Sequence, residues 1–239
     1  MVITLLAACD RLTKPTSSGR PYEVLVVVDD QLWQRPAGRA LFDVLDTDVP
    51  GLPQPERSFR ISQTTQKRFS QVLNIFRTII KVDIDPTQYT QTKMKFTRDV
   101  YARPQVVLTI QSPNEKDFAA FVKKNSRSII DFLVKVEMNR QINELEEKHS
   151  EAVSQLAEEI FKCQLWAPAE IKSYKKGKDF FWASSNTASG LVNICMYSYP
   201  YEGPRTFNKQ YVLAKRDSVM KANIPGTEPR MYMATDTLC

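Results

Sequence analysis

A long helical pattern is the feature that most constrains the fold of this chain. Ser112-Pro113-Asn114-Glu115 begins it, because proline and acidic residues suit the first turn of a helix. Apolar residues then recur every three or four positions as far as Phe161. One unbroken helix of roughly 48 residues would extend about 70 Å, longer than most domains are wide. We therefore expect either a break near Asn125-Ser126 or a helix that crosses two subdomains. An amphipathic helix packed on a sheet is favoured over a coiled-coil arm.

Strands and helices alternate ahead of this helical region. Residues Tyr22–Val28 form a continuous β-branched run that is followed by two aspartates, which is typical of a strand buried on both faces. Apolar residues at helical spacing follow Thr64 and Thr65, either of which can cap a helix, so a helix is expected there. Its apolar residues are Phe69, Val72, Leu73 and Phe76. The other elements predicted in this part are a helix over 39–45 and strands over 58–62, 78–84, 92–98 and 105–111.

A hairpin and a further strand follow the helical region. Residues 170–176 and 179–184 flank Gly177 and predict two antiparallel strands, and residues 191–199 predict the next strand. The order strand, helix, Pro-Gly turn and strand then occurs a second time, with Ile224-Pro225-Gly226 in the place of Val49-Pro50-Gly51. A chance recurrence of a common turn is the alternative. A true repeat predicts that residues 191–236 superpose on residues 24–62, with both first strands central in related sheets.

The predicted fold class is α+β with α/β-like character. Two related strand–helix–strand subdomains are joined by a long helical segment, and the second copy is incomplete. The predicted segments are 1–9 (a lipoprotein signal remnant), 10–20 (a polar tether), 21–111 (the first subdomain), 112–162 (the long helical segment) and 163–239 (the second, truncated subdomain).

The first nine residues have the pattern of a bacterial lipobox. A short apolar run leads into Leu6-Ala7-Ala8-Cys9, and polar chain starts at Asp10. The run is too short to span a bilayer, so it fits a signal peptide, and the Cys9 thiol would carry lipid. No Lys or Arg precedes Cys9, although such signals normally begin with positive charge. A buried strand with an incidental cysteine is the alternative. The lipobox predicts a protein anchored to the bacterial cell envelope, on the periplasmic or outer-surface side.

Several segments resemble a bacterial lipoprotein family known as domain of unknown function 4837. They are Arg20–Val27, Asp30–Trp33, the Pro-Gly-Leu-Pro-Gln-Pro run within Val49–Glu56, and the lipobox. The resemblance covers nearly the whole chain, and it implies a longer protein than the sequence given. The family has no known activity, cofactor or catalytic residue, so the resemblance implies no site.

The chain carries no recognised catalytic motif. It has one histidine, His149, which lies among Glu and Lys residues and is expected on the solvated face of the long helix. Asp29, Asp30, Asp83 and Asp85 end strands, where carboxylates either cap turns or gather for acid–base chemistry. Cys163 and Cys195 either form a disulfide or stay unpaired. No cofactor and no metal site is predicted.

One predicted surface mixes cations with aromatic rings. The hairpin carries Lys172, Lys175, Lys176, Lys178 and Trp182. Together with a net charge of +6, this composition suits an anionic membrane surface, although a solvated turn above buried rings is the alternative. The secretion signal argues against nucleic acid. Trp33 and Trp166 are expected in the core rather than as exposed platforms for sugars.

Two classes of function follow. The favoured one is a non-catalytic, lipid-anchored envelope protein that attaches to the membrane through Cys9 and binds an envelope protein, a glycan or an anionic lipid. The alternative is an envelope hydrolase that uses strand-end carboxylates such as Asp29, Asp30 and Asp83.

Overall fold

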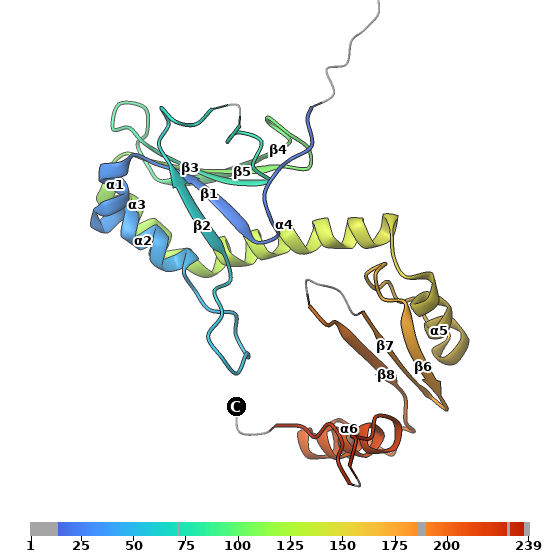
Figure 1. Ribbon diagram of the computed structural model, residues 1–239. Coiled ribbons are helices and arrows are strands. Elements are labelled where there is room, and N and C mark those ends of the chain that lie inside the picture. Colours follow the sequence, from blue (N-terminus) through green and yellow to red (C-terminus); the bar gives the residue numbers. More distant parts are fainter. Residues whose placement is uncertain (1–13, 71, 186–189, 229, 237–239) are drawn as a thin grey trace, which may run out of the picture. The chain divides into compact units, whose positions relative to one another are not determined.

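The fold is α+β, as expected, and divides into two compact units (Figure 1). A computed structural model describes residues 14–70, 72–185, 190–228 and 230–236. The first unit extends to Arg140 and the second begins at Gln141. The predicted lipidation site, Cys9, lies outside the described residues. Within them, no helix combines the length and the apolar character needed to cross a bilayer.

The first unit is built on a mixed five-stranded sheet in the order β2-β1-β3-β5-β4. Its strands are β1 (Glu23–Val27), β2 (Arg60–Thr64), β3 (Thr78–Ile84), β4 (Lys93–Arg98) and β5 (Val106–Ser112). All neighbours are parallel except β4, which is antiparallel to β5. The expectation that residues 22–28 form a buried strand is confirmed, because β1 lies between β2 and β3 and its valines are buried.

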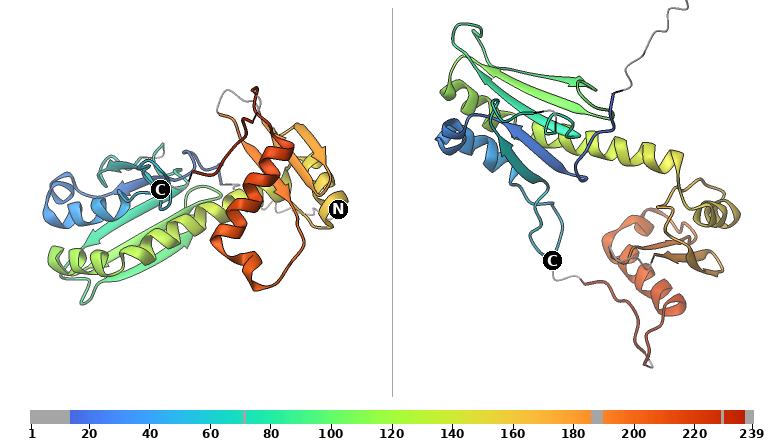
Figure 2. Two further views of the ribbon diagram at one scale, coloured as in Figure 1. Left: turned by 90° about the horizontal axis from the view of Figure 1, so that it is seen from below. Right: turned by 45° about the horizontal axis from the view of Figure 1, so that its top comes forward.

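Four helices cover one face of this sheet, as Figure 1 and the turned views of Figure 2 show. They are α1 (Asp30–Gln34), α2 (Pro36–Leu45), α3 (Glu115–Lys124) and α4 (Ser126–Glu147). The side chains of β1, β3 and β5 that point to this face pack against Leu41 of α2, Phe118 of α3 and Ile129 of α4. The predicted break near Asn125 is confirmed, because α3 ends at Lys124 and α4 begins at Ser126.

The opposite face of the sheet is covered at one end only. The predicted helix over residues 64–76 is wrong, because Thr64 ends β2 and the described residues after it form turns and irregular chain. Phe69, Leu73 and Phe76 nevertheless pack on Leu25, Val27 and Ile79 of the sheet, whereas Val72 stays 74% exposed. In a helix, Val72 would lie on the same buried face as the other three apolar residues. The spacing of these residues therefore reflects their packing onto the sheet and not a helix.

Residues of the predicted tether pair with the first unit. The backbone N–H of Ser17 donates to the Arg103 carbonyl (3.0 Å), and the Arg103 N–H donates to the Pro15 carbonyl (2.9 Å). The Arg77 N–H donates to the Ser18 carbonyl (2.8 Å). The described part of residues 10–20 is therefore attached to the unit.

The second unit contains a three-stranded antiparallel sheet in the order β6-β7-β8. Its elements are α5 (Glu151–Phe161), β6 (Ser173–Gly177), β7 (Phe180–Ser184), β8 (Asn193–Tyr197), a 3-10 turn η1 (Pro204–Phe207) and α6 (Lys209–Asn223). The predicted hairpin is confirmed as β6 and β7. Val153 and Leu156 of α5 pack against Phe181 and Ala183 of β7. Asn223 of α6 approaches Gly177 so closely that a Cβ there would lie 2.9 Å from its Oδ1 atom.

The predicted internal repeat is wrong in its sheet topology. β1 is central in a largely parallel sheet, whereas β8 lies at the edge of an antiparallel sheet. After α6, the described residues contain only an isolated bridge between Pro225 and Tyr232 in place of a strand. A Pro-Gly turn is a local signal that ends a helix, and it does not determine which strands pair afterwards.

Candidate functional site

A cleft of about 560 Å³ opens at the carboxyl ends of the parallel strands in the first unit. The chain leaves β1 to form β2 on one side and then crosses to form β3 on the other, so β1 and β3 flank the point where the strand order reverses. Open α/β sheets bind ligands at this point, because the connections that leave the strands there diverge. The polar lining residues are Asp29, Gln66, Lys81, Asp83, Lys95, Thr109 and Gln111.

The strand register arranges the polar side chains in two rows on the partly open face of the sheet. One row is Lys81, Thr109 and Lys95, which pair across β3, β5 and β4. The next row toward the carboxyl ends is Asp83, Gln111 and Lys93. Neighbouring strands lie about 4.8 Å apart and the rows about 7 Å apart. Two cationic groups therefore flank a hydroxyl. A carboxylate and an amide lie beside them, and Lys93, at the end of the second row, is outside the lining of the cleft.

Sequence reasoning missed Lys81, Lys95, Thr109 and Gln111 as site residues. The available signal was alternation, because Lys81 and Asp83 alternate with Val82 and Ile84, and β5 shows the same pattern. Such alternation indicates a strand with one polar face. It does not reveal which strands lie side by side, and the site exists only through that pairing.

A chain of hydrogen bonds fixes Asp83. The Tyr89 hydroxyl donates to the Asp83 carboxylate and accepts from Gln111 Nε2 at 2.7 Å. The hydrogen bond to Asp83 raises the pKa of Tyr89, and burial acts in the same direction. Tyr89 therefore remains a neutral donor, and Asp83 keeps its second carboxylate oxygen for a ligand.

The two lysines of the cleft are available for an anion. Lys81 Nζ lies 5.3 Å from the centre of the Phe69 ring, a cation–π distance. Within the described residues, neither Lys81 nor Lys95 forms an ion pair with a carboxylate of the protein. Their positive charge is thus not neutralised by a direct partner there.

The strand-end aspartates have different surroundings. Asp29 and Asp83 line the same cleft, whereas Asp30 accepts from Gln63 Nε2 (3.0 Å) and lies 3.6 Å from Arg68 in a neighbouring hollow. Asp85 closes a turn: the Thr87 hydroxyl (2.6 Å) and backbone N–H (2.8 Å) donate to it and hold its pKa below the ordinary value. Asp29 also caps α1 by accepting from the Gln31 N–H (3.0 Å).

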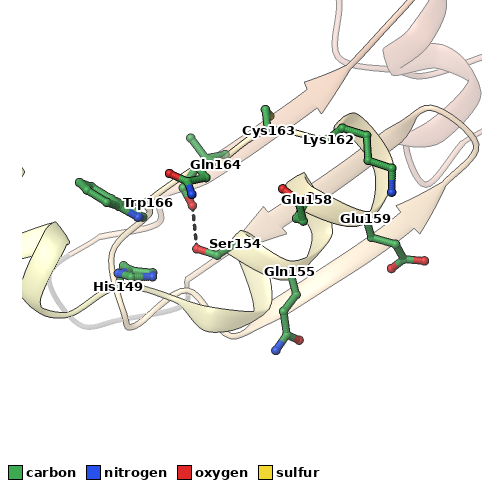
Figure 3. A pocket seen from close by; sticks show the side chains of 10 residues that line it. His149, Ser154, Gln155, Glu158, Glu159, Lys162, Cys163, Gln164 and Trp166 are labelled. Atoms are coloured by element: carbon green, nitrogen blue, oxygen red, sulfur yellow. Dashed lines mark hydrogen bonds between the residues drawn. The ribbon is translucent and has the colours of Figure 1, made fainter.

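A second groove, of about 670 Å³, lies beside α5 in the second unit (Figure 3). His149 and Trp166 stack there with ring centres 5.8 Å apart, and His149 Nδ1 lies 2.8 Å from the Leu145 carbonyl oxygen. Trp166 is 39% exposed, so its predicted place in the core is wrong, while Trp33 is buried as predicted.

His149 lies beyond the end of α4 and is half-buried by its stacking on Trp166, so its predicted place on a solvated helix face is wrong. Among the described residues, no three His, Cys, Asp or Glu side chains gather as metal ligands.

The four hairpin lysines do not form one patch. In the β6–β7 register, Lys175 lies opposite Trp182 and Lys176 opposite Phe181, so the two lysines occupy opposite faces of the sheet. Lys175 Nζ donates to the Asn223 carbonyl at 2.6 Å, and Lys176 forms an ion pair with Glu159. Lys172 and Lys178 are exposed.

Cys163 and Cys195 are free thiols, so the predicted alternative of a disulfide between them is wrong. Burial raises the pKa of the Cys195 thiol, and the charge of Arg216 only partly opposes this effect. Cys195 therefore stays protonated at neutral pH.

Two family matches divide the chain. Residues 17–146 match the family described as domain of unknown function DUF8532. The chain belongs to this family. Residues 150–239 match a second family, domain of unknown function DUF4837, which confirms the resemblance expected from the sequence. The expectation that this resemblance covers nearly the whole chain is wrong, because the match is confined to the second unit. The segments between Arg20 and Glu56 that suggested it lie in the DUF8532 region. No curated protein and no solved structure matches the chain.

Proposed function

We propose that this protein is a non-catalytic, lipid-anchored protein of the bacterial cell envelope, and that its first unit binds an acidic saccharide. The observation that carries the proposal is the pair of polar rows in the cleft at the carboxyl ends of β1, β3 and β5. Such a crevice is where sheets of this type bind small ligands.

The row of Asp83 and Gln111 suits sugar hydroxyls. A carboxylate accepts hydrogen bonds and an amide both donates and accepts, so together they satisfy hydroxyls that do both. The Tyr89 hydroxyl forms hydrogen bonds with both Asp83 and Gln111, so the row is fixed before a ligand arrives. Fixed polar groups lower the entropy cost of binding.

The row of Lys81, Thr109 and Lys95 suits a carboxylate. Lys81 and Lys95 lie on strands separated by β5, about 10 Å apart at the backbone, and their long side chains can converge above Thr109. Hydrogen bonds between charged groups are roughly twice as strong as neutral ones. The two rows thus match a ring that carries one carboxylate and several hydroxyls.

NMR titration of the purified full chain with glucuronate and with glucose, its neutral counterpart, tests this function. We expect glucuronate to bind more tightly, with shifts confined to the cleft. Lys81→Met with Lys95→Met should weaken glucuronate binding about tenfold or more and leave glucose binding unchanged. Lys123→Met with Lys135→Met, at exposed positions of α3 and α4, is the charge-matched control. The proposal fails if neither sugar perturbs the cleft, or if the double variant binds glucuronate like the wild type.

The hydrolase remains a second candidate because Asp29 and Asp83 line one cleft. Two carboxylates across a glycosidic bond are the usual catalytic pair of glycosidases. Incubation with a glucuronate-containing oligosaccharide separates the candidates. Cleavage that disappears in Asp83→Asn would favour the hydrolase, whereas binding without cleavage supports the non-catalytic function.

The envelope location rests on the Leu6-Ala7-Ala8-Cys9 lipobox. We expect the protein to incorporate a fatty-acid analogue in a bacterial host and to fractionate with membranes, and Cys9→Ala to abolish both. Unchanged labelling and fractionation of Cys9→Ala would remove the lipid anchor from the proposal.

A further inference from the structure

The turn between β8 and α6 holds two large aromatic rings in solvent. Tyr201 is 63% exposed and Phe207 is 77% exposed, and their ring centres lie 5.5 Å apart. We call residues 201–209 the aromatic turn. Adjacent exposed apolar side chains with polar surroundings are typical of surfaces that contact a partner or a membrane.

The aromatic turn is fixed by its own hydrogen bonds. The buried Thr206 hydroxyl accepts from the Glu202 N–H at 3.0 Å, and the Thr206 N–H donates to the Gly203 carbonyl at 3.0 Å. Gly203 has φ 105° and ψ −178°, a conformation that essentially only glycine adopts. Asn208 then caps α6 by accepting from the Tyr211 N–H at 2.8 Å. The rings are therefore presented in a defined arrangement.

Positive charge accompanies the rings. Arg205 lies between them in the sequence and Lys209 follows them, and both side chains are exposed. In the part of the chain that the structure describes, neither forms an ion pair. Glu202, the acidic residue of the turn, accepts a hydrogen bond from the Tyr211 hydroxyl at 3.2 Å. The turn thus carries a net positive charge beside its rings.

We propose that the aromatic turn inserts into the surface of an anionic phospholipid bilayer. The exposed parts of two such rings can bury about 300 Å² in total, less than half of the roughly 800 Å² that each partner contributes to a stable protein interface. A bilayer needs no larger patch, because rings insert at the headgroup level while cations contact lipid phosphates. Area and charge together favour the membrane over a protein partner, and this contact does not depend on lipid at Cys9.

Vesicle co-sedimentation of the full chain carrying Cys9→Ser tests the contact without an anchor. We expect binding to phosphatidylcholine vesicles that contain phosphatidylglycerol, and weaker binding to phosphatidylcholine alone. Tyr201→Ser with Phe207→Ser should reduce binding to anionic vesicles about tenfold or more. Arg205→Gln with Lys209→Gln should reduce binding and flatten its salt dependence. Tyr174→Ser, at a ring 57% exposed on β6, is the matched control and should bind like the Cys9→Ser parent.

Two further variants separate insertion from loose adsorption. Phe207→Trp should be quenched by lipids with brominated acyl chains, whereas Tyr174→Trp should not. Gly203→Ala removes no ring but strains the turn, so it should also weaken binding. The proposal is overturned if the parent ignores anionic vesicles at low salt, if the ring variant binds unchanged, or if Phe207→Trp is not quenched.

Discussion

Gln105 determines how the turns of residues 65–77 are held on the sheet. Its side chain is 1% exposed, and its Nε2 atom donates to the carbonyls of Asn74 (2.6 Å) and Phe76 (2.7 Å). Its Oε1 atom accepts from the Tyr101 N–H at 2.9 Å. Gln105→Leu keeps the volume but leaves three backbone groups without this partner. Each unsatisfied buried group costs about 1–3 kcal/mol, and the buried leucine offsets part of the sum. We expect a loss of about 3 kcal/mol, or about 10 °C in the melting temperature of a unit this size.

Urea unfolding followed by hydrogen exchange measures this loss in the first unit alone, because the exchange of each peptide reports the stability of the unit that contains it. Protection of residues 72–77 should fall most. Gln88→Leu is the control, since Gln88 is exposed and its side chain bonds, among the described residues, to Asp85 alone; it should change stability by less than about 0.5 kcal/mol. Because Phe69 lies beside Lys81, Gln105→Leu should also weaken glucuronate binding. A Gln105→Leu protein as stable as the wild type would refute the assigned role of this side chain.

Two other experiments test the effect of burial on charged and titratable side chains. Glu137 bridges Arg77 (2.8 Å) and Arg140 (2.9 Å) with its side chain 3% exposed, so Glu137→Gln should cost about 3–5 kcal/mol in urea unfolding. Asp43→Asn, in the exposed Arg39–Asp43 pair, should cost less than about 1 kcal/mol, and equal costs would contradict the argument. Burial raises the pKa of Cys195, so its alkylation rate, followed by peptide mass spectrometry, should have a pH midpoint above the ordinary 9.0. A midpoint at or below that value would show that the thiol is not shielded.

Local sequence signals predicted the elements whose formation depends on near neighbours. The break at Asn125 is one example: its side-chain amide donates to the Phe121 carbonyl at 2.8 Å and ends α3. Asn114 begins the same helix by accepting from the Asp117 N–H at 2.8 Å. β1 was predicted because a continuous β-branched run fits a strand covered on both faces.

The elements that were missed depend on residues distant in the sequence. Residues 65–77 have helical spacing, but their carbonyls at Asn74 and Phe76 are bound by Gln105, about thirty positions later. The same holds for the cleft, since Lys81 and Lys95 join one row only through β5 between them. The aromatic residues of the aromatic turn were visible in the sequence, but their exposure depends on the turn that Thr206 and Gly203 form.

The arrangement of charge in the cleft matters more for its ligand than the net charge of the chain. Asp29 and Asp83 balance Lys81 and Lys95 within the lining, so a uniform attraction for anions is not expected from the cleft as a whole. Selectivity between acidic and neutral sugars must therefore come from the distance between the row of Lys81 and Lys95 and the row of Asp83, which is about 7 Å along the strands. Salt screens the attraction of Lys81 and Lys95 for a carboxylate, but it barely affects hydrogen bonds between neutral hydroxyls and the row of Asp83. Glucuronate binding should therefore weaken with rising salt while glucose binding stays constant, and Asp83→Asn should weaken both. A parallel salt dependence for the two sugars would mean that the rows do not act separately.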